Sequence, residues 1–245
     1  MEWAEDAIVL SARRHGESNI VLEGLTRSHG RHLGLVHGGS SRRYRSAVLP
    51  GNTLHVMWRA RLPEHLGTFA IELRRERAGA ILEKRDALVG LSSFAEISRV
   101  VLPEREPHPG LYEAAEILLD AIATDDYALW APLYVRWELG VLEALGFGLD
   151  LSRCAATGQT DDLRYVSPRS GRAVSCAAGE PYRDRLFEIP AFLVQPREAS
   201  ASHSEIRAGL GLTAHFLLQR VLLPHHRPIP DARARLDVLA ARESA

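Results

Sequence analysis

Hydrophobic and polar residues alternate along the first part of the chain in the way that is typical of β-strands. The apolar positions gather in five short stretches with glycine-containing connections between them. These stretches are residues 7–10, 19–26, 30–36, 54–58 and 69–73. Five short strands of this kind predict a small β-barrel or β-sandwich.

From about residue 81 the apolar positions change to a spacing of three and four residues, which is the spacing of amphipathic helices. The clearest stripes run over residues 111–122 and 130–145, and an arginine-rich helix is expected over residues 231–242. Residues 148–200 break this pattern with prolines, glycines and both cysteines of the chain. Such a long stretch without helical period is expected to be a folded subelement or a mobile functional segment.

Two capping-box patterns predict helix starts, because a serine followed three residues later by glutamate satisfies free N–H groups of the first turn. Ser202 with Glu205 precedes a helix that Pro224 is expected to end. Ser93 with Glu96 predicts the start of a shorter helix in the same half of the chain.

The change of period predicts an α+β chain of two domains. A five-stranded domain is expected over residues 1–80, and an α-helical domain over residues 81–245 that carries the irregular insertion 148–200. The chain has 245 residues, of which 46% are hydrophobic and 25% charged. This composition is ordinary for globular proteins and leaves the assignment unchanged.

The formal net charge of −1 conceals an uneven distribution. Residues 1–80 carry a net charge of +4 and residues 81–245 a net charge of −5. Between Glu23 and Glu64 there is no acidic residue, which points to an anion-binding module joined to a different one. The acid-free stretch contains seven arginines: Arg27, Arg31, Arg42, Arg43, Arg45, Arg59 and Arg61.

The centre of the acid-free stretch, residues 38–45, combines glycines and serines with three arginines and a tyrosine. Backbone N–H groups of such a loop can approach phosphates, while the arginines supply charge and Tyr44 a stacking face. A solvated surface loop would explain three arginines alone, but seven without an intervening acid favour nucleic acid. Trp58 is a second residue that could stack on bases, with a place in the core as the alternative.

Other kinds of chemistry find little support in the sequence. Cys154 and Cys176 each stand alone, whereas a structural zinc site takes four ligands in pairs, so two free buried thiols are expected. The scattered histidines, among them His29 and His32, are expected at the surface. Nucleophile elbows, phosphate-binding loops and clustered carboxylates are missing from the sequence. We therefore expect neither enzymatic activity nor a cofactor.

The sequence also bears on compartment. The N-terminal residues are acidic and do not have the pattern of a signal peptide, and no apolar run approaches the roughly 20 residues of a membrane span. Two cysteines are too few for a disulfide-rich secreted scaffold. A soluble, cytoplasmic chain with reduced thiols and no membrane partner is expected.

The order of several segments resembles the RecO family of bacterial DNA repair and recombination mediators. The resemblance covers nearly the whole chain, and the order of the segments is what makes it specific. They are residues 6–19 (DAIVL through HGESN), 26–43 (TRSHGR followed by GGS and RR), 143–151 (EALGFGLDL) and 165–175 (YVSPRSGRAVS).

The resemblance implies an N-terminal OB fold and an α-helical C-terminal domain. It implies binding of single- and double-stranded DNA, strand annealing, and help in loading RecA onto DNA coated by single-strand-binding protein. RecR and the acidic C-terminal tail of single-strand-binding protein are implied as partners, and the chain would be associated with the nucleoid.

One departure from the family concerns zinc. Some members carry four zinc-binding cysteines in two pairs, and here Cys154 matches the first ligand while Thr157 replaces its partner. Ser167 and Ser170 stand where the second pair would be sought. We therefore predict a ribbon-like loop without zinc.

For DNA binding we expect one face of the barrel to neutralise phosphates without regard to base sequence. The acidic tail is expected to dock between helices where arginines meet an apolar groove, involving Arg136, Arg207 or Arg220. The alternative function is a non-catalytic scaffold whose OB fold binds acidic protein tails rather than DNA. The residues assigned to DNA are Arg27, Arg31, Arg42, Arg43, Tyr44, Arg45, Arg59 and Arg61.

Overall fold

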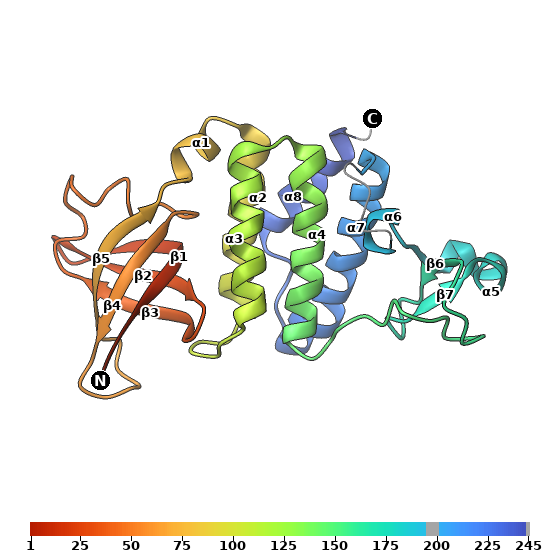
Figure 1. Cartoon of the computed structure of the whole chain (residues 1–245), viewed down its shortest axis with the longest axis horizontal. Coiled ribbons are helices and arrows are strands. Elements are labelled where there is room, and N and C mark those ends of the chain that lie inside the picture. Colours follow the sequence, from red (N-terminus) through yellow and green to blue (C-terminus); the bar gives the residue numbers. More distant parts are fainter. Residues whose placement is uncertain (195–200, 244–245) are drawn as a thin grey trace. The chain divides into compact units, whose positions relative to one another are not determined.

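The computed structural model describes residues 1–194 and 201–243 (Figure 1). It contains two compact units, Met1–Asp125 and Asp126–Ala245. The strands of the first unit end at Arg75, but three helices that follow them belong to the same unit. The expected division into domains 1–80 and 81–245 therefore stays a prediction.

The first unit begins with a closed five-stranded barrel in the order β1-β2-β3-β5-β4, with β4 paired to β1, which is the OB fold. The register of β1 shifts between Val9 and Ser11, and this irregularity helps one long strand to pair with β4 and then with β2. The fold class expected from the sequence is confirmed. The strands are β1 (Glu2–His15), β2 (Asn19–Thr26), β3 (Gly30–Val36), β4 (Thr53–Arg59) and β5 (Thr68–Arg75).

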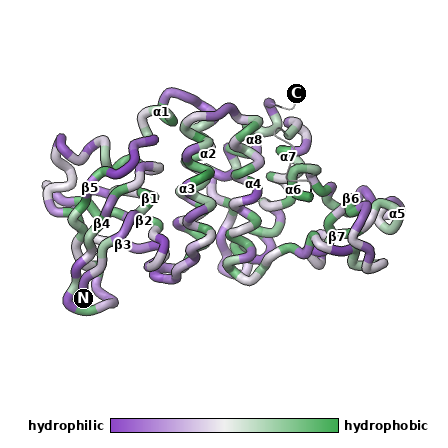
Figure 2. Tube along the Cα trace, in the orientation of Figure 1, coloured by the Kyte–Doolittle hydropathy of each residue, from purple (hydrophilic) through white to green (hydrophobic). Residues whose placement is uncertain are grey.

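The barrel strands carry both hydrophobic and hydrophilic residues (Figure 2), and buried and half-buried positions alternate along β3, so that one side of this strand faces inward. Residues 37–52, which join β3 to β4, close one end of the barrel, since Ala47 and Val48 belong to its core. The Asn52 side chain fixes this segment by donating to the carbonyl oxygens of Ser46 and Ala47, at 2.9 and 3.2 Å. Its carbonyl oxygen accepts from the backbone N–H of Arg77, 2.8 Å away.

Three helices complete the first unit: α1 (Ala78–Leu82), α2 (Arg85–Val101) and α3 (Pro109–Thr124). The helix start predicted at Ser93 is wrong, because α2 begins at Arg85 and Ser93 is buried in its middle. The apolar stripe continues upstream through Ala87 and Leu91, so the helix extends past the serine and the capping pattern is not used.

The second unit contains α4 (Tyr127–Ala144), α7 (His203–Phe216) and α8 (Asp231–Glu243). The capping box of Ser202 and Glu205 is present at the start of α7, as the sequence predicts. After α7 the chain continues as a π-helix, Leu217–Leu222, and a 3-10 turn, Leu223–His225, that contains Pro224. None of the helices that the structure describes is long and apolar enough to cross a membrane.

The described part of the insertion is a folded subelement rather than a structureless loop. A three-stranded sheet in the order β7-β6-β8 forms its centre. Residues 195–200 of the expected insertion lie outside the described residues. The elements are β6 (Leu163–Val166), β7 (Ala173–Ser175), α5 (Cys176–Gly179), η1 (Glu180–Arg185), β8 (Phe187–Glu188) and α6 (Ala191–Val194).

Candidate nucleic-acid interface

Three arginines of the acid-free stretch project from the segment 37–52, which we call the arginine loop. Arg42, Arg43 and Arg45 are exposed, and no carboxylate of the described residues lies within ion-pair distance of them. The Arg43 guanidinium carbon lies 5.3 Å from the ring centre of half-buried Tyr44, which packs against the barrel core. The loop therefore presents three uncompensated cations beside an aromatic ring.

The arginine loop is ordered by short hydrogen bonds to its neighbours. The backbone N–H and the hydroxyl of Ser40 both donate to the carbonyl oxygen of Ser18, at 3.0 and 2.9 Å. Gly38, with φ +65°, places its N–H 3.1 Å from the Asn19 side-chain oxygen. These contacts hold the loop against the turn between β1 and β2.

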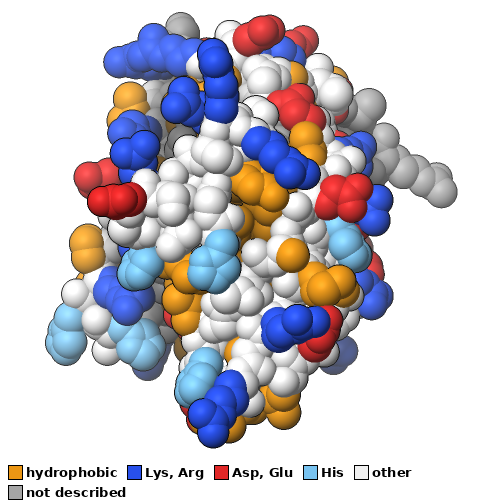
Figure 3. Space-filling model, turned by 90° about the vertical axis from the view of Figure 1, so that its left-hand side faces the viewer, with side chains coloured by type: hydrophobic (Ala, Val, Ile, Leu, Met, Phe, Trp, Pro, Cys, Tyr) orange, Lys and Arg blue, Asp and Glu red, His pale blue; other side chains and the backbone are white. Residues whose placement is uncertain are grey.

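Contact with that turn adds two arginines that the acid-free stretch did not include. Arg13 and Arg14 stand at the exposed end of β1, where Arg13 lies 3.9 Å from Glu23 and Arg14 pairs across the ladder with Ile20. Gly39 of the loop packs against the same Ile20. The side of the barrel seen in Figure 3 carries more basic than acidic side chains, most densely toward the upper edge of the view. Adjacent arginines at a strand end were the only sequence signal for this extension.

Other arginines of the stretch are already paired with carboxylates. Arg27 lies 2.9 Å from Glu113 of α3, and Arg59 lies 2.9 Å from Glu2 of β1. Arg61 is exposed, with no ion-pair partner among residues 1–194 and 201–243. Carboxylates from other parts of the chain therefore lie beside some arginines of the acid-free stretch.

Arg31 is the most strongly compensated of the seven. Its side chain is 13% exposed, lies 2.5 Å from Glu23 and donates through Nε to the carbonyl oxygen of Leu102. Burial opposes ionisation of Glu23, but hydrogen bonds from Arg99, Arg31 and Ser11 outweigh it and lower the pKa of that carboxyl. Arg31 and Arg99 of α2 thus attach the helices to the barrel through one buried carboxylate.

The aromatic residues also differ from expectation in part. Trp58 is 2% exposed and its Nε1 donates to the carbonyl oxygen of Leu66 at 3.0 Å, so the alternative of a core position holds. The expectation of a surface position is wrong for His32, which is 3% exposed because its place on β3 points it inward. Burial lowers the pKa of His32 to about 4, so the ring is neutral at neutral pH.

The three arginines expected to receive an acidic tail lie in the second unit. Arg136 of α4 is half-buried and donates to the carbonyl oxygen of Phe192, while Arg207 of α7 is exposed. Arg220 donates to the carbonyl oxygen of Arg169 at 2.6 Å. Thirteen residues of nearly continuous helix separate Arg207 from Arg220, which corresponds to about 20 Å along the axis. These two arginines therefore do not form one compact cluster.

The insertion holds both free cysteines, as expected, although only Cys154 is fully buried. The Cys154 sulfur accepts a hydrogen bond from the N–H of Ser175 at 3.3 Å. Burial opposes ionisation of this thiol, but hydrogen bonds from Ser175 and Thr157 lower its pKa to about 6. Thr157 thus serves the sulfur as a hydrogen-bond donor. Among the residues described, no group of three or more His, Cys, Asp or Glu side chains is placed to hold a metal ion.

Comparison with known proteins agrees with this architecture. Residues 1–75 match the family model "Recombination protein O N terminal", and residues 82–228 match "Recombination protein O C terminal". The DNA repair protein RecO of Rhodospirillum centenum is 53% identical over 96% of this chain and 93% of its own length.

Two further relatives support the same assignment over the full length. The DNA repair protein RecO of Methylobacterium nodulans is 52% identical over 100% of both chains. That of Rhodospirillum rubrum is 45% identical over 100% of this chain and 98% of its own. Family models that span most of the chain and relatives at this identity lead to one conclusion: the chain belongs to the RecO family of DNA repair proteins.

Proposed function

We propose that this chain acts in DNA repair and recombination by binding single- and double-stranded DNA at the arginine loop and annealing complementary strands. Loading of RecA onto DNA coated by single-strand-binding protein is part of the same proposal. The observation that carries it is the set of three exposed arginines, Arg42, Arg43 and Arg45, which have no carboxylate partner among the described residues and stand on an ordered loop of an OB barrel.

The physical basis of this binding is charge neutralisation. A guanidinium group meets a phosphate through a forked pair of hydrogen bonds, and such contacts do not depend on base sequence. Two strands whose phosphates are neutralised on one surface repel each other less, so base pairing between them can begin. Annealing by this route makes and breaks no covalent bond, and no catalytic residue is required.

The remaining residues assigned to DNA take secondary parts in the proposal. Tyr44 is proposed to stack on a base beside the loop, and Arg61 to hold a phosphate near the loop between β4 and β5. Arg27 and Arg59 could bind phosphate only by giving up a carboxylate partner. The half-buried Arg31 supports the barrel rather than contacting DNA in this proposal.

Partners of opposite charge complete the proposal. The acidic C-terminal tail of single-strand-binding protein is proposed to dock on the second unit, with its carboxylates on Arg207 and on Arg136 or Arg220. RecR is proposed as the second protein partner. Since Arg207 is the most exposed of the three arginines, Arg207→Glu should weaken binding of an acidic tail peptide and leave DNA affinity unchanged.

A salt titration tests the DNA-binding part directly. Fluorescence anisotropy with a labelled single-stranded oligonucleotide should give a steep linear fall of log affinity with log salt, and different base sequences should give similar lines. A flat line would contradict phosphate contacts. If an acidic peptide displaced the oligonucleotide from the arginine loop and itself bound there more tightly, the scaffold function would replace DNA binding.

A further inference from the structure

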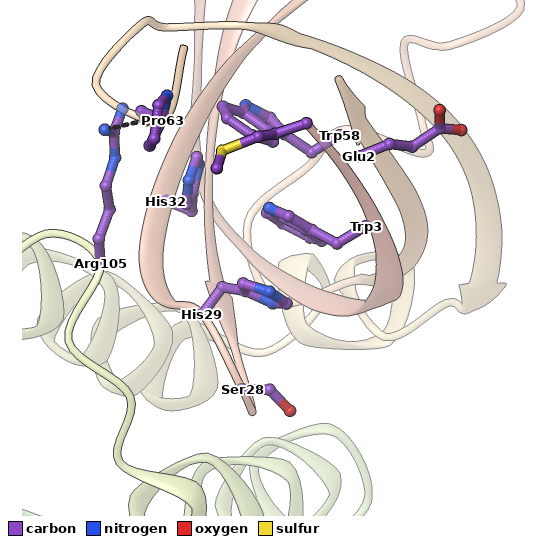
Figure 4. A pocket seen from close by; sticks show the side chains of 9 residues that line it. Glu2, Trp3, Ser28, His29, His32, Trp58, Pro63 and Arg105 are labelled. Atoms are coloured by element: carbon purple, nitrogen blue, oxygen red, sulfur yellow. Dashed lines mark hydrogen bonds between the residues drawn. The ribbon is translucent and has the colours of Figure 1, made fainter. Parts of the chain in front are cut away.

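A cavity of about 500 Å³ opens at the side of the barrel within the first unit (Figure 4). Its walls come from the start of β1, the turn between β2 and β3, the end of β4, and the loop 60–67 between β4 and β5. We call it the aromatic pocket. The lining residues used below are Trp3, His29, His32, Trp58, Pro63 and Arg105.

Flat rings form one side of the aromatic pocket. His29 stacks on Trp3 with ring centres 4.1 Å apart and planes 8° from parallel, and Trp58 lies on the other side of Trp3, 5.8 Å away (Figure 4). His32 meets both tryptophans edge-on, at 5.2 and 4.9 Å. The outermost ring, His29, remains 36% exposed and is held in place by Glu5. The stack is thus rigid, and its edge is open to solvent.

Arg105 forms the opposite side of the pocket. Its backbone is left-handed, with φ 63°, a conformation that residues other than glycine rarely adopt. Its backbone N–H donates to the carbonyl oxygen of Arg31. The guanidinium donates to carbonyl oxygens of the loop 60–67, including that of His65 at 2.9 Å. No carboxylate of the described residues lies within ion-pair distance. A cation without a counter-charge is therefore held over the pocket at some conformational cost.

The position and chemistry of the pocket favour one kind of occupant. OB folds bind oligonucleotides on the face of β2 and β3 and at the loops between β1 and β2 and between β4 and β5. In this barrel, the loop between β4 and β5 and the turn after β2 form walls of the pocket. Flat rings and a guanidinium plane are the groups on which unstacked bases stack, whereas an aliphatic side chain would leave the cation unmatched.

We propose that the aromatic pocket takes an unpaired nucleobase of a single strand whose neighbouring phosphate reaches Arg61. A paired base cannot enter, because both its faces and its hydrogen-bonding edge are occupied in the duplex. The pocket therefore gives the barrel a preference for single-stranded segments that the phosphate contacts of the loop arginines do not supply. This inference rests on the proposed DNA binding.

The test separates base capture from phosphate binding. Affinities of the full-length protein are measured by anisotropy for an oligothymidylate and for an oligonucleotide of equal length whose residues are abasic. The wild type should bind the abasic strand about tenfold more weakly. In the variant His29→Ala, and separately in Trp3→Ala, this difference should be about fivefold smaller, while the part due to the base proposed to stack on Tyr44 remains.

A matched control is available on the same barrel. His55 of β4 is 34% exposed and pairs with Asp6 at 2.8 Å, much as His29 pairs with Glu5, but it does not line the pocket. His55→Ala should keep the full difference between the two strands. Trp3 packs against the core, so its replacement can destabilise the fold. The result for Trp3→Ala is used only if its thermal unfolding transition matches that of His55→Ala. If it does not, the conclusion rests on His29→Ala alone.

The outcomes distinguish the two proposals. The pocket does not hold a base if the ratio of the two affinities, oligothymidylate over abasic strand, is the same for wild type and His29→Ala. The same conclusion follows if wild type binds both strands equally. In either case DNA binding by the arginine loop stands. If neither strand binds at any salt concentration, the proposed function itself fails. A pocket that receives a side chain of a partner protein would give the first of these results.

Discussion

The arginine loop allows a quantitative prediction about salt. In the variant Arg42→Gln/Arg43→Gln/Arg45→Gln three exposed guanidinium groups are lost, none with a carboxylate partner among the described residues. The matched control is the variant Arg27→Gln/Arg59→Gln/Arg75→Gln, in which each replaced arginine is exposed but paired with a carboxylate. The pairs are Arg27 with Glu113, Arg59 with Glu2 and Arg75 with Asp120, at 2.9, 2.9 and 2.8 Å. Both variants lose three positive charges.

The expected size of the effect follows from counterion release. Each phosphate contact on a single strand contributes about −0.7 to the slope of log affinity against log salt, so three lost contacts should reduce the slope by about 2. Over a fourfold rise in salt, the affinity of the wild type should therefore fall by a factor about 20 times larger than that of the loop variant. The control variant should change the slope by less than about 1, because paired guanidinium groups lose no phosphate contact.

The measurement is an anisotropy titration of the two variants and the wild type at several salt concentrations, with circular dichroism to verify folding. Equal slopes for wild type and loop variant would refute the assignment of the arginine loop as the phosphate-binding surface. Equal reductions in both variants would show that total charge, rather than the local absence of carboxylates, controls binding.

Three further predictions concern buried ionisable groups. Because burial lowers the pKa of His32 to about 4 from 6.5, its contribution to stability is complete above pH 6.5 and is lost as the pH falls through 4, an effect of about 3 kcal/mol. Urea unfolding of His32→Phe should lack this component, and an unchanged pH profile would contradict it. Glu138→Leu removes the buried carboxylate 2.6 Å from the fully buried Arg233 and leaves it only the partly exposed Asp237, so it should cost about 3–5 kcal/mol, most of it recovered when Arg233→Leu is added. Failure of the double variant to recover in chemical unfolding would argue against compensation within the pair. Thiolate absorbance of Cys154 should appear with a midpoint near pH 6 and persist in Cys176→Ser, and a midpoint near 9 would contradict the hydrogen bonds to its sulfur.

The second and third barrel strands were predictable from their local sequence: residues 19–26 form a run rich in apolar and β-branched residues, and residues 30–36 have the period of two that strands show. Residues 19–26 and 30–36 were expected as strands and are β2 and β3 with the same bounds. The first strand was expected only over residues 7–10, whereas β1 runs from Glu2 to His15. Its outer parts carry exposed polar residues and are held by pairing to β4 and β2, and such long-range pairing leaves no apolar signal in a local window.

The paired arginines were missed for a related reason. Glu2 faces Arg59 because β1 pairs with β4, and Glu113 reaches Arg27 from α3, more than 80 residues away in the chain. Arginines of a stretch without acids can therefore be compensated by carboxylates from elsewhere in the chain. The aromatic pocket was also invisible in the sequence, since its residues come from five separate segments that only the barrel brings together.

Compensation also decides how the acid-free stretch should be interpreted. Arg31 and Arg99 stabilise a carboxylate, Glu23, that is 2% exposed, and removing either one leaves buried negative charge with fewer donors. A variant of Arg31 would thus weaken the attachment of α2 to the barrel, and any loss of DNA binding could follow from that structural change. Arg42, Arg43 and Arg45 have no such contact with a carboxylate in the part of the chain that the structure describes. Because the same residue type attaches helices in one place and is free in another, the phosphate-binding surface has to be assigned from the pairing of each guanidinium and not from the number of arginines.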